Sequence, residues 1–96
     1  MFLLFFGIIY SKVCKDHKLN IITNGLKYED NRKLKEIKKI LPSDIFIQIH
    51  RSFIINISYL MKYKKSKVTM ANNDTITVGR LYKDEFENFY QNFLIR

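Results

Sequence analysis

The sequence predicts a mainly β domain with minor α content, in which one short helix lies near the middle and a second helix ends the chain. Short β-branched and aromatic runs, separated by polar turn residues, fill most of the 96 positions. Apolar residues recur at helical spacing in two stretches, after Asp30 and after Arg80. A hydrophobic content of 47%, without linkers or repeats, fits a single domain over residues 1–96.

The apolar N-terminus, MFLLFFGIIY, is interpreted as leading into a buried strand over residues 5–13. Its uncharged run, residues 1–11, is much shorter than the roughly 20 residues that a membrane-spanning helix needs. No basic residue precedes the run and no small-residue cleavage site follows it, so a signal peptide fits poorly. Phenylalanine and isoleucine suit a strand that is buried on both faces.

Two more strands are predicted over residues 18–23 and 26–28, joined by a tight turn at Asn24-Gly25, because both turn residues tolerate positive φ. A short helix is predicted next, with Asp30 or Asn31 as its N-cap and Pro42 just past its end. Its apolar stripe is Leu34, Ile37, Ile40 and Leu41. The lysines outside this stripe are interpreted as a solvated face: Lys33, Lys35, Lys38 and Lys39.

The second half of the chain contains the remaining strands and the last helix. Strands are predicted over residues 45–49, 53–57, 59–63, 68–71 and 75–78, with turns at KKSK and NND. The last helix carries an apolar stripe at Phe86, Phe89, Tyr90, Phe93 and Leu94, and acidic residues near its start at Asp84, Glu85 and Glu87. An aromatic stripe at this spacing indicates a helix that packs on the core.

The charge of the chain favours an anionic partner. Seventeen Lys and Arg against nine Asp and Glu give a formal charge of +8, and the basic residues are spread along most of the chain. A folded domain this basic is typical of proteins that meet phosphates or anionic lipid. The alternative is that the charge only keeps an apolar chain in solution. Cys14 is the single cysteine, which excludes an intramolecular disulfide and favours the cytoplasm.

Catalytic and metal-binding patterns are sparse, so we predict no enzyme, no metal site and no cofactor. Cys14 and His17 have the spacing of half a zinc site, but a structural zinc needs four ligands and His50 is the one obvious further candidate. Cys14 with His17 is also a weak nucleophile-and-base pair, because no third group orients them. The three glycines are isolated, so no glycine-rich phosphate loop exists.

Binding chemistry is better represented, in three polar and basic junctions between apolar segments. They are CKDHK at 14–18, HRS at 50–52 and GRLYK at 79–83. Arginine donates bidentate hydrogen bonds to guanine and also pairs with phosphate. His50 could instead be a satisfied core histidine, and Arg80 could form a surface ion pair with Asp84. Three such junctions on a chain of this charge favour nucleic acid.

The segment FIQIHRSFIINISYL resembles the LytTR domain, the DNA-binding module of bacterial response regulators of the LytR/AgrA type. The matching motif residues are Phe46, His50, Arg51, Ser52, Phe53, Ile54, Ile55 and Asn56. A helix ending in leucine precedes the motif, and Val78-Gly79-Arg80 resembles the Val-Ser-Arg segment that leads to the last helix of the family. The resemblance covers about residues 8–94.

The resemblance implies an elongated stack of antiparallel β-sheets whose loops enter successive major grooves along one side of a DNA duplex. It implies base contacts by His17 and Arg80, and a contact between them by Arg51. The expected backbone or groove contacts are Arg51, His50, Lys15, Lys18 and Lys83. Ser52 and Asn56 are expected to be structural. The implied protein is a cytoplasmic transcription regulator that binds double-stranded DNA, as a homodimer if its sites are repeated, with no small-molecule substrate.

Two departures from the family pattern stand out. Gly79 replaces the usual serine, which removes a hydroxyl and is expected to loosen Arg80. The chain also begins where the first family strand should be ending, so either MFLLFF substitutes for that strand or the domain has an exposed sheet edge that invites self-association. The alternative function is a protein-interaction or membrane-surface module that uses the apolar N-terminus and the lysines.

Overall fold

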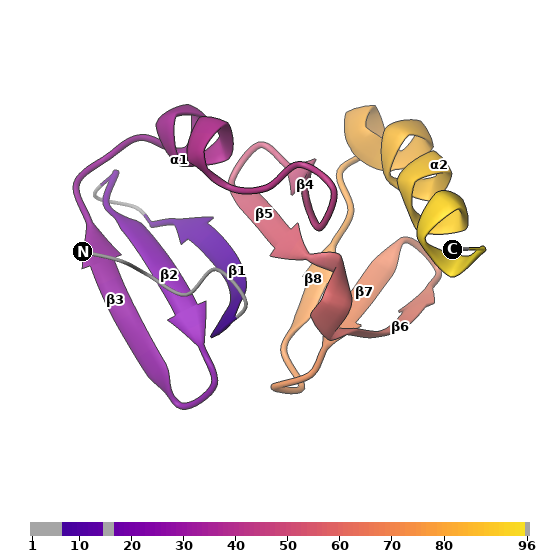
Figure 1. Ribbon diagram of the computed structural model, residues 1–96, viewed down its shortest axis with the longest axis horizontal. Coiled ribbons are helices and arrows are strands. Elements are labelled where there is room, and N and C mark those ends of the chain that lie inside the picture. The colour runs from indigo at the N-terminus through magenta and orange to yellow at the C-terminus, as the bar shows by residue number, and fades with distance from the viewer. Residues whose placement is uncertain (1–6, 15–16, 96) are drawn as a thin grey trace.

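The computed structural model describes residues 7–14 and 17–95, and they form two antiparallel sheets with two α-helices (Figure 1). The five-stranded sheet has the order β3-β2-β1-β5-β4, and the three-stranded sheet has the order β6-β7-β8. The strands are β1 Ile8–Val13, β2 Leu19–Thr23, β3 Leu26–Asp30, β4 Phe46–His50, β5 Phe53–Asn56, β6 Leu60–Lys64, β7 Lys67–Met70 and β8 Thr75–Thr77. The helices are α1 Leu34–Ile40 and α2 Lys83–Leu94, with 3-10 turns η2 Ile57–Tyr59 and η3 Arg80–Tyr82. The predicted fold class is confirmed.

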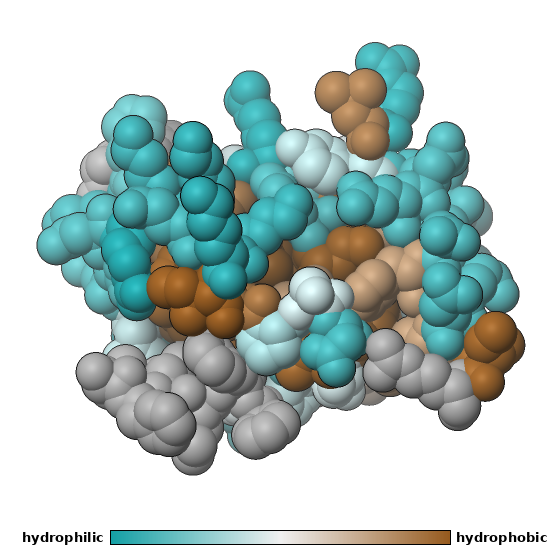
Figure 2. All heavy atoms as spheres, turned by 45° about the horizontal axis from the view of Figure 1, so that its top comes forward, coloured by the Kyte–Doolittle hydropathy of each residue, from teal (hydrophilic) through white to brown (hydrophobic). Residues whose placement is uncertain are grey.

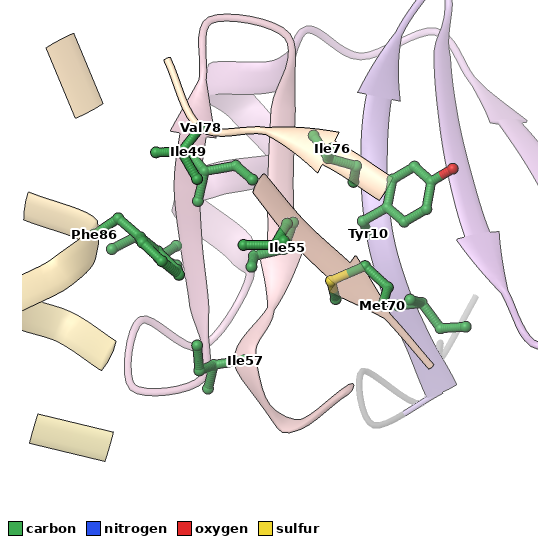
Figure 3. Packing of buried hydrophobic residues seen from close by; sticks show 11 residues of the cluster. Tyr10, Ile49, Ile55, Ile57, Met70, Ile76, Val78 and Phe86 are labelled. Atoms are coloured by element: carbon green, nitrogen blue, oxygen red, sulfur yellow. The ribbon is translucent and has the colours of Figure 1, made fainter. Parts of the chain in front are cut away.

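The five-stranded sheet is the middle layer of the domain. Alternate residues of its strands point to opposite faces, and each face is covered by another layer. On one face it packs against α1 in a cluster that we call the helix core. The helix core is Ile8, Leu19, Ile21, Leu34, Ile37, Leu41, Phe46 and Ile54. On the other face it packs against the three-stranded sheet and α2 in the sandwich core, shown in Figure 3. The sandwich core is Ile9, Tyr10, Ile47, Ile49, Ile55, Ile57, Val68, Met70, Ile76, Val78 and Phe86.

Helix α2 closes the sandwich core with its aromatic stripe, as predicted. Phe86 is fully buried, and the centre of its ring lies 4.9 Å from the ring centre of Tyr63 on β6. Phe89, Tyr90 and Phe93 are only partly buried against this core. Leu94 does not belong to the stripe, since it is 56% exposed at the end of the helix. Most of the packing contribution of α2 therefore rests on Phe86.

The predicted N-cap of α1, Asp30 or Asn31, is wrong, because the N-cap residue is Lys33 and the side chain of Asp30 is used elsewhere. Asp30 ends β3, and its carboxylate accepts hydrogen bonds from the backbone N–H and the guanidinium of Arg32, at 2.8 and 2.7 Å. The helix begins only at Leu34, with Lys33 as the N-cap residue. The Glu36 carboxylate accepts the Lys33 backbone N–H at 2.8 Å, which satisfies one free donor at the helix start. The prediction that Ile40 belongs to the apolar stripe of α1 is also wrong, because its side chain is 48% exposed.

The hairpin turns of the two sheets differ. The Asn24-Gly25 turn is present as predicted, although only Gly25 has positive φ, at 88°. In the KKSK segment, Lys65 and Ser66 both adopt positive φ, at 53° and 63°. Both central residues of a type I′ turn have positive φ, a conformation that usually selects Asn and Gly. The β6–β7 turn therefore holds two ordinary residues in a strained conformation.

Strand β1 lies inside its sheet, between β2 and β5, so the edges of that sheet are β3 and β4. The question whether MFLLFF substitutes for a further strand concerns residues 1–6, which lie outside the described residues. The structural role of Asn56 is confirmed. Its buried amide donates to the Ile8 carbonyl at 3.0 Å and accepts the Ser58 N–H at 2.8 Å where β5 ends.

Candidate nucleic-acid interface

The three basic junctions meet along one edge of the molecule, which is the upper side in Figure 1. The register places Lys12 of β1 opposite Phe53 of β5, so the β1–β2 loop and the β4–β5 turn leave the same end of the sheet. The Val13 N–H donates to the Ser52 carbonyl at 2.9 Å and ties these two junctions together. The Gly79 N–H donates to the Ile49 carbonyl at 2.7 Å, which places the β8–α2 junction next to the β4–β5 turn.

Two of the junctions share a surface depression of about 300 Å³. Its lining residues are His50, Arg51, Gly79, Arg80, Leu81 and Tyr82. Arg51 and Arg80 are both exposed, and within residues 7–14 and 17–95 neither guanidinium has a hydrogen-bond or ion-pair partner. The alternative ion pair between Arg80 and Asp84 is therefore not formed. Two guanidinium groups that no described residue neutralises make this depression a candidate site for an anion.

The β4–β5 turn that carries Arg51 is fixed by its neighbours. The Nδ1 atom of His50 accepts the Ser52 backbone N–H at 3.1 Å, and the Gln48 side-chain amide donates to the His50 carbonyl at 3.1 Å. The imidazole of His50 packs edge-on against the ring of Phe53, with 5.5 Å between the ring centres. His50 is thus half-buried and partly structural, as its alternative interpretation held, but its ring also lines the depression.

Gly79 is explained by close packing rather than by its backbone angles. Its φ is −65°, which any residue can adopt. A Cβ atom at this position would lie 3.2 Å from Cδ2 of Tyr82 and 3.6 Å from Cδ2 of His50. The Tyr82 N–H donates to the Gly79 carbonyl at 2.9 Å, and the Gly79 N–H is bonded to β4. Two hydrogen bonds therefore fix the backbone of Gly79, next to Arg80. This does not support the expectation that glycine at this position loosens Arg80.

In the first junction, backbone hydrogen bonds hold the position of His17. The Cys14 N–H donates to the Lys18 carbonyl and the His17 N–H donates to the Cys14 carbonyl, both at 2.9 Å. The side-chain amide of Asn20 donates to Cys14 Sγ at 2.8 Å. His17 is exposed and has a φ of 65°, a left-handed conformation that is uncommon for a residue other than glycine. The side chain of His17 is thus exposed beside two backbone hydrogen bonds that hold the ends of the loop together.

The structure brings some predicted site residues together and leaves others apart. His50, Arg51 and Arg80 line one depression, and His17 lies in the loop that is bonded to the same turn. Lys83 is the half-buried first residue of α2, Lys18 is exposed beside β2, and Lys15 lies outside the described residues. The charge of Asp30, at the same end of the sheet, is balanced by Arg32, whose guanidinium lowers the pKa of that carboxyl.

Sequence reasoning missed two residues of the depression, Leu81 and Tyr82. Leu81 is 94% exposed, an unusual environment for a leucine that borders two arginines. The signal was present, since Leu81 is an apolar residue inside a polar junction. Figure 2, which turns this edge toward the viewer, shows hydrophilic side chains over most of the face around a more apolar centre.

The described residues form no helix that is long and apolar enough to cross a membrane. The chain matches the family model of the LytTr DNA-binding domain over residues 1–91. The transcriptional regulatory protein NatR of Bacillus subtilis (strain 168) is 34% identical over 76 residues, which cover 73% of this chain and 33% of NatR. The sensory transduction protein LytT of Enterococcus faecalis (strain ATCC 700802 / V583) is 29% identical over 84 residues, which cover 82% of this chain and 35% of that protein.

The chain thus spans about a third of the length of the curated relatives that it matches. A solved LytTr DNA-binding domain from Bacillus cereus has the same fold, with a TM-score of 0.81 at 27% sequence identity. The superposition covers 91% of this chain and 84% of that domain. The motif, the fold and the family match agree, and the chain belongs to the LytTr DNA-binding domain family.

Proposed function

We propose that this domain binds double-stranded DNA in a sequence-specific manner and regulates transcription in the cytoplasm, with its loops inserted into successive major grooves. The observation that carries the proposal is the pair of arginines, Arg51 and Arg80, on one depression. Neither is neutralised by a described residue, and the backbone beside each is hydrogen-bonded in place. Guanidinium groups on a fixed backbone suit both phosphate and the guanine edge.

The dimensions of the domain support contacts in more than one groove. Its extents are 33 × 25 × 25 Å, and one turn of B-DNA is about 34 Å long. His17 and Arg80 belong to different junctions on the same edge, so they can face grooves on either side of one stretch of backbone. In this arrangement Arg51, between them, contacts phosphate, with Lys15, Lys18, His50 and Lys83 as further backbone or groove contacts. Two copies bind side by side where the target site is repeated.

The roles within the third junction follow from side-chain chemistry. Arg80 has the fork of donors that recognises guanine O6 and N7. Leu81 adds an exposed apolar group next to it, which fits the methyl group of a thymine in the same groove. His17 reads a second groove more weakly, because a neutral imidazole offers a single donor and a single acceptor.

Selection of bound duplexes from a random pool tests the proposal first, because an enriched motif is its direct expectation. The enriched duplex is then measured with Arg80→Ala, Arg80→Lys and the control Lys39→Ala, which removes one charge from the outer face of α1. Arg80→Ala should lose about 1–3 kcal/mol of discrimination at one base pair. Arg80→Lys should keep the salt dependence but lose the same discrimination, because lysine retains the charge without the bidentate fork.

Single base-pair changes in the duplex complete the test. His17→Ala should change the preference at base pairs in a different groove from those affected by Arg80→Ala. If both variants keep the wild-type base preferences, the assigned base contacts are wrong. If no duplex is enriched and wild-type protein binds none at low salt, the domain does not work as a DNA-binding module.

A further inference from the structure

The outer face of the three-stranded sheet carries a second concentration of positive charge, away from the depression described above. A hollow of about 310 Å³ on this face is lined by Lys62, Lys64, Lys65, Lys67, Thr69 and Thr75. These six lining residues include four lysines and no carboxylate. Within the described part of the chain, none of the four lysines has an ion-pair or hydrogen-bond partner.

The pairing of the strands shows that this charge is unfavourable for the free protein. Val68 and Ile76 face the core, so the alternate residues of β6, β7 and β8 face solvent together. Lys64 and Lys67 stand directly opposite each other across the hairpin. Like charges in directly opposed positions destabilise a sheet, and here they sit on a turn that is already strained. An anion that bridges these lysines would remove the repulsion.

The lysine face is continuous with the candidate DNA-binding edge. The Ser66 carbonyl accepts the Val78 N–H at 2.8 Å, which puts the β6–β7 turn beside the segment that leads into Arg80. Lys67 is paired with Thr77, the last residue of β8 before that segment. The lysines beside this segment have long flexible stems, which can extend toward the phosphates that flank a duplex held by Arg80.

We propose that this lysine face is a second phosphate-binding surface, which holds the DNA backbone flanking the site that the three junctions read. The inference rests on the proposed function. Threonine hydroxyls between the lysines donate to phosphate oxygens. Contacts from lysine and threonine to the DNA backbone carry no direct information about the base sequence. The surface adds affinity that is independent of sequence and sensitive to salt.

The test compares two variants with the same loss of three charges. The outer-face variant is Lys62→Gln/Lys64→Gln/Lys67→Gln, and the control variant is Lys27→Gln/Lys35→Gln/Lys39→Gln, on β3 and the solvated side of α1. Both are titrated by fluorescence anisotropy against a labelled duplex of about 30 base pairs, roughly three helical turns, over a range of salt concentrations. The outer-face variant should lose about two to three units of the slope of log affinity against log salt, at about 0.9 per phosphate. The control should lose less than one unit.

Two further readouts separate the explanations. The outer-face variant should unfold at the same temperature as wild type or higher, because its like-charge pair is gone, and Lys64→Gln alone should lose about one slope unit. The ratio of affinities for selected and scrambled duplexes should not change. Equal slopes for the outer-face and control variants overturn the inference while leaving the proposed function intact.

Vesicles of phosphatidylglycerol and phosphatidylcholine form the last arm. If the outer-face variant loses binding to these vesicles but keeps the wild-type duplex slope, the face recognises anionic lipid and the inference is wrong. If wild-type protein binds no duplex at low salt, the proposed function itself fails, which is a different result from equal slopes.

Discussion

The two faces of the five-stranded sheet are buried in different ways. The sandwich core contains aromatic residues from both layers, and two of the tyrosine hydroxyls in and around it have carboxylate partners. Tyr10 donates to the Asp74 carboxylate at 2.6 Å, and Tyr63 donates to the Glu87 carboxylate at 2.5 Å. The helix core is almost wholly aliphatic and is covered by α1, a helix of only seven residues. On that face the buried hydroxyl of Ser11 has no hydrogen-bond partner among the described residues.

This difference coincides with the position of the arginines. The ring of His50 packs on that of Phe53, and the ring centres of Phe53 and Tyr10 are 6.0 Å apart. The Tyr10 hydroxyl in turn donates to Asp74, in the turn between β7 and β8 of the three-stranded sheet. The junctions of Arg51 and Arg80 are therefore supported from the sandwich side, by rings and cross-layer hydrogen bonds. Groups that must be held within a fraction of an ångström benefit from such support. The variants below test whether the sandwich side is indeed the better-packed one.

The largest expected effect is that of Phe86→Ala. Removing a fully buried phenylalanine from the sandwich core should lower the free energy of unfolding by about 3–5 kcal/mol, through lost transfer energy and the cavity that remains. Urea denaturation followed by circular dichroism measures it. Phe89→Ala is the matched control and should cost clearly less, because Phe89 is only partly buried. Equal costs for the two variants would mean that α2 packs differently from the structure.

Tyr10→Phe should have the next largest effect, because it removes the hydroxyl that joins the two sheets. A hydrogen bond to a charged group contributes about 1.5–3 kcal/mol, and the remaining bond from Asn72 to Asp74 should keep the cost near the lower end. Thermal unfolding measures the loss. An unchanged melting temperature would show that the cross-layer bond contributes nothing to the sandwich side.

The same tyrosines predict how stability changes at alkaline pH. Burial, and then the hydrogen bond to Glu87, raises the pKa of Tyr63 to about 12, from 10.0. Burial and Asp74 raise the pKa of Tyr10 in the same direction. The unfolded chain therefore loses these protons first, so their stabilising contribution is complete below pH 10 and is lost as the pH rises toward 12 and above. The difference in stability between wild type and Tyr63→Phe should shrink over that range, and a constant difference would contradict the assignment.

Ser11→Ala tests the opposite face and should stabilise the protein. Ser11 is paired with Ile21 and Ile54, so its hydroxyl points into the aliphatic helix core. A buried hydroxyl without a partner costs about 1–3 kcal/mol, and alanine removes that cost while leaving a space of one oxygen atom. We expect a gain of about 1 kcal/mol in urea denaturation. A loss of stability would show that the helix core is better satisfied than the structure indicates.

The sequence predicted the strands and the aromatic helix because their signals are local: alternation in 45–49 and helical spacing after Arg80. It failed at the start of α1, where Asp30 binds Arg32 instead of capping, since two local hydrogen bonds compete for one carboxylate. The sequence identified the three basic junctions but did not predict that they lie at one edge of the molecule, because that depends on the register in which Lys12 pairs with Phe53. Glycine at position 79 is explained by the close approach of the Tyr82 ring, and the lysine face is formed by the pairing of β6 with β7. Both are contacts in space that a linear sequence does not show.

The smallest expected effect concerns a strained turn on the sandwich side, the β6–β7 turn. Ser66 has a φ of 63°, where a side chain costs energy and glycine does not. Glycine also loses more chain entropy on folding, so Ser66→Gly should stabilise the protein by only about 0.5 kcal/mol. Gly25→Ala, in the β2–β3 turn with a φ of 88°, is the reverse control and should destabilise it by about 1 kcal/mol. Differential scanning calorimetry of both variants measures the two changes in stability.

Because Ser66→Gly keeps all four lysines, its salt slope for duplex binding should equal that of wild type. A gain in stability with an altered slope would mean that the strained turn itself shapes the DNA-binding surface.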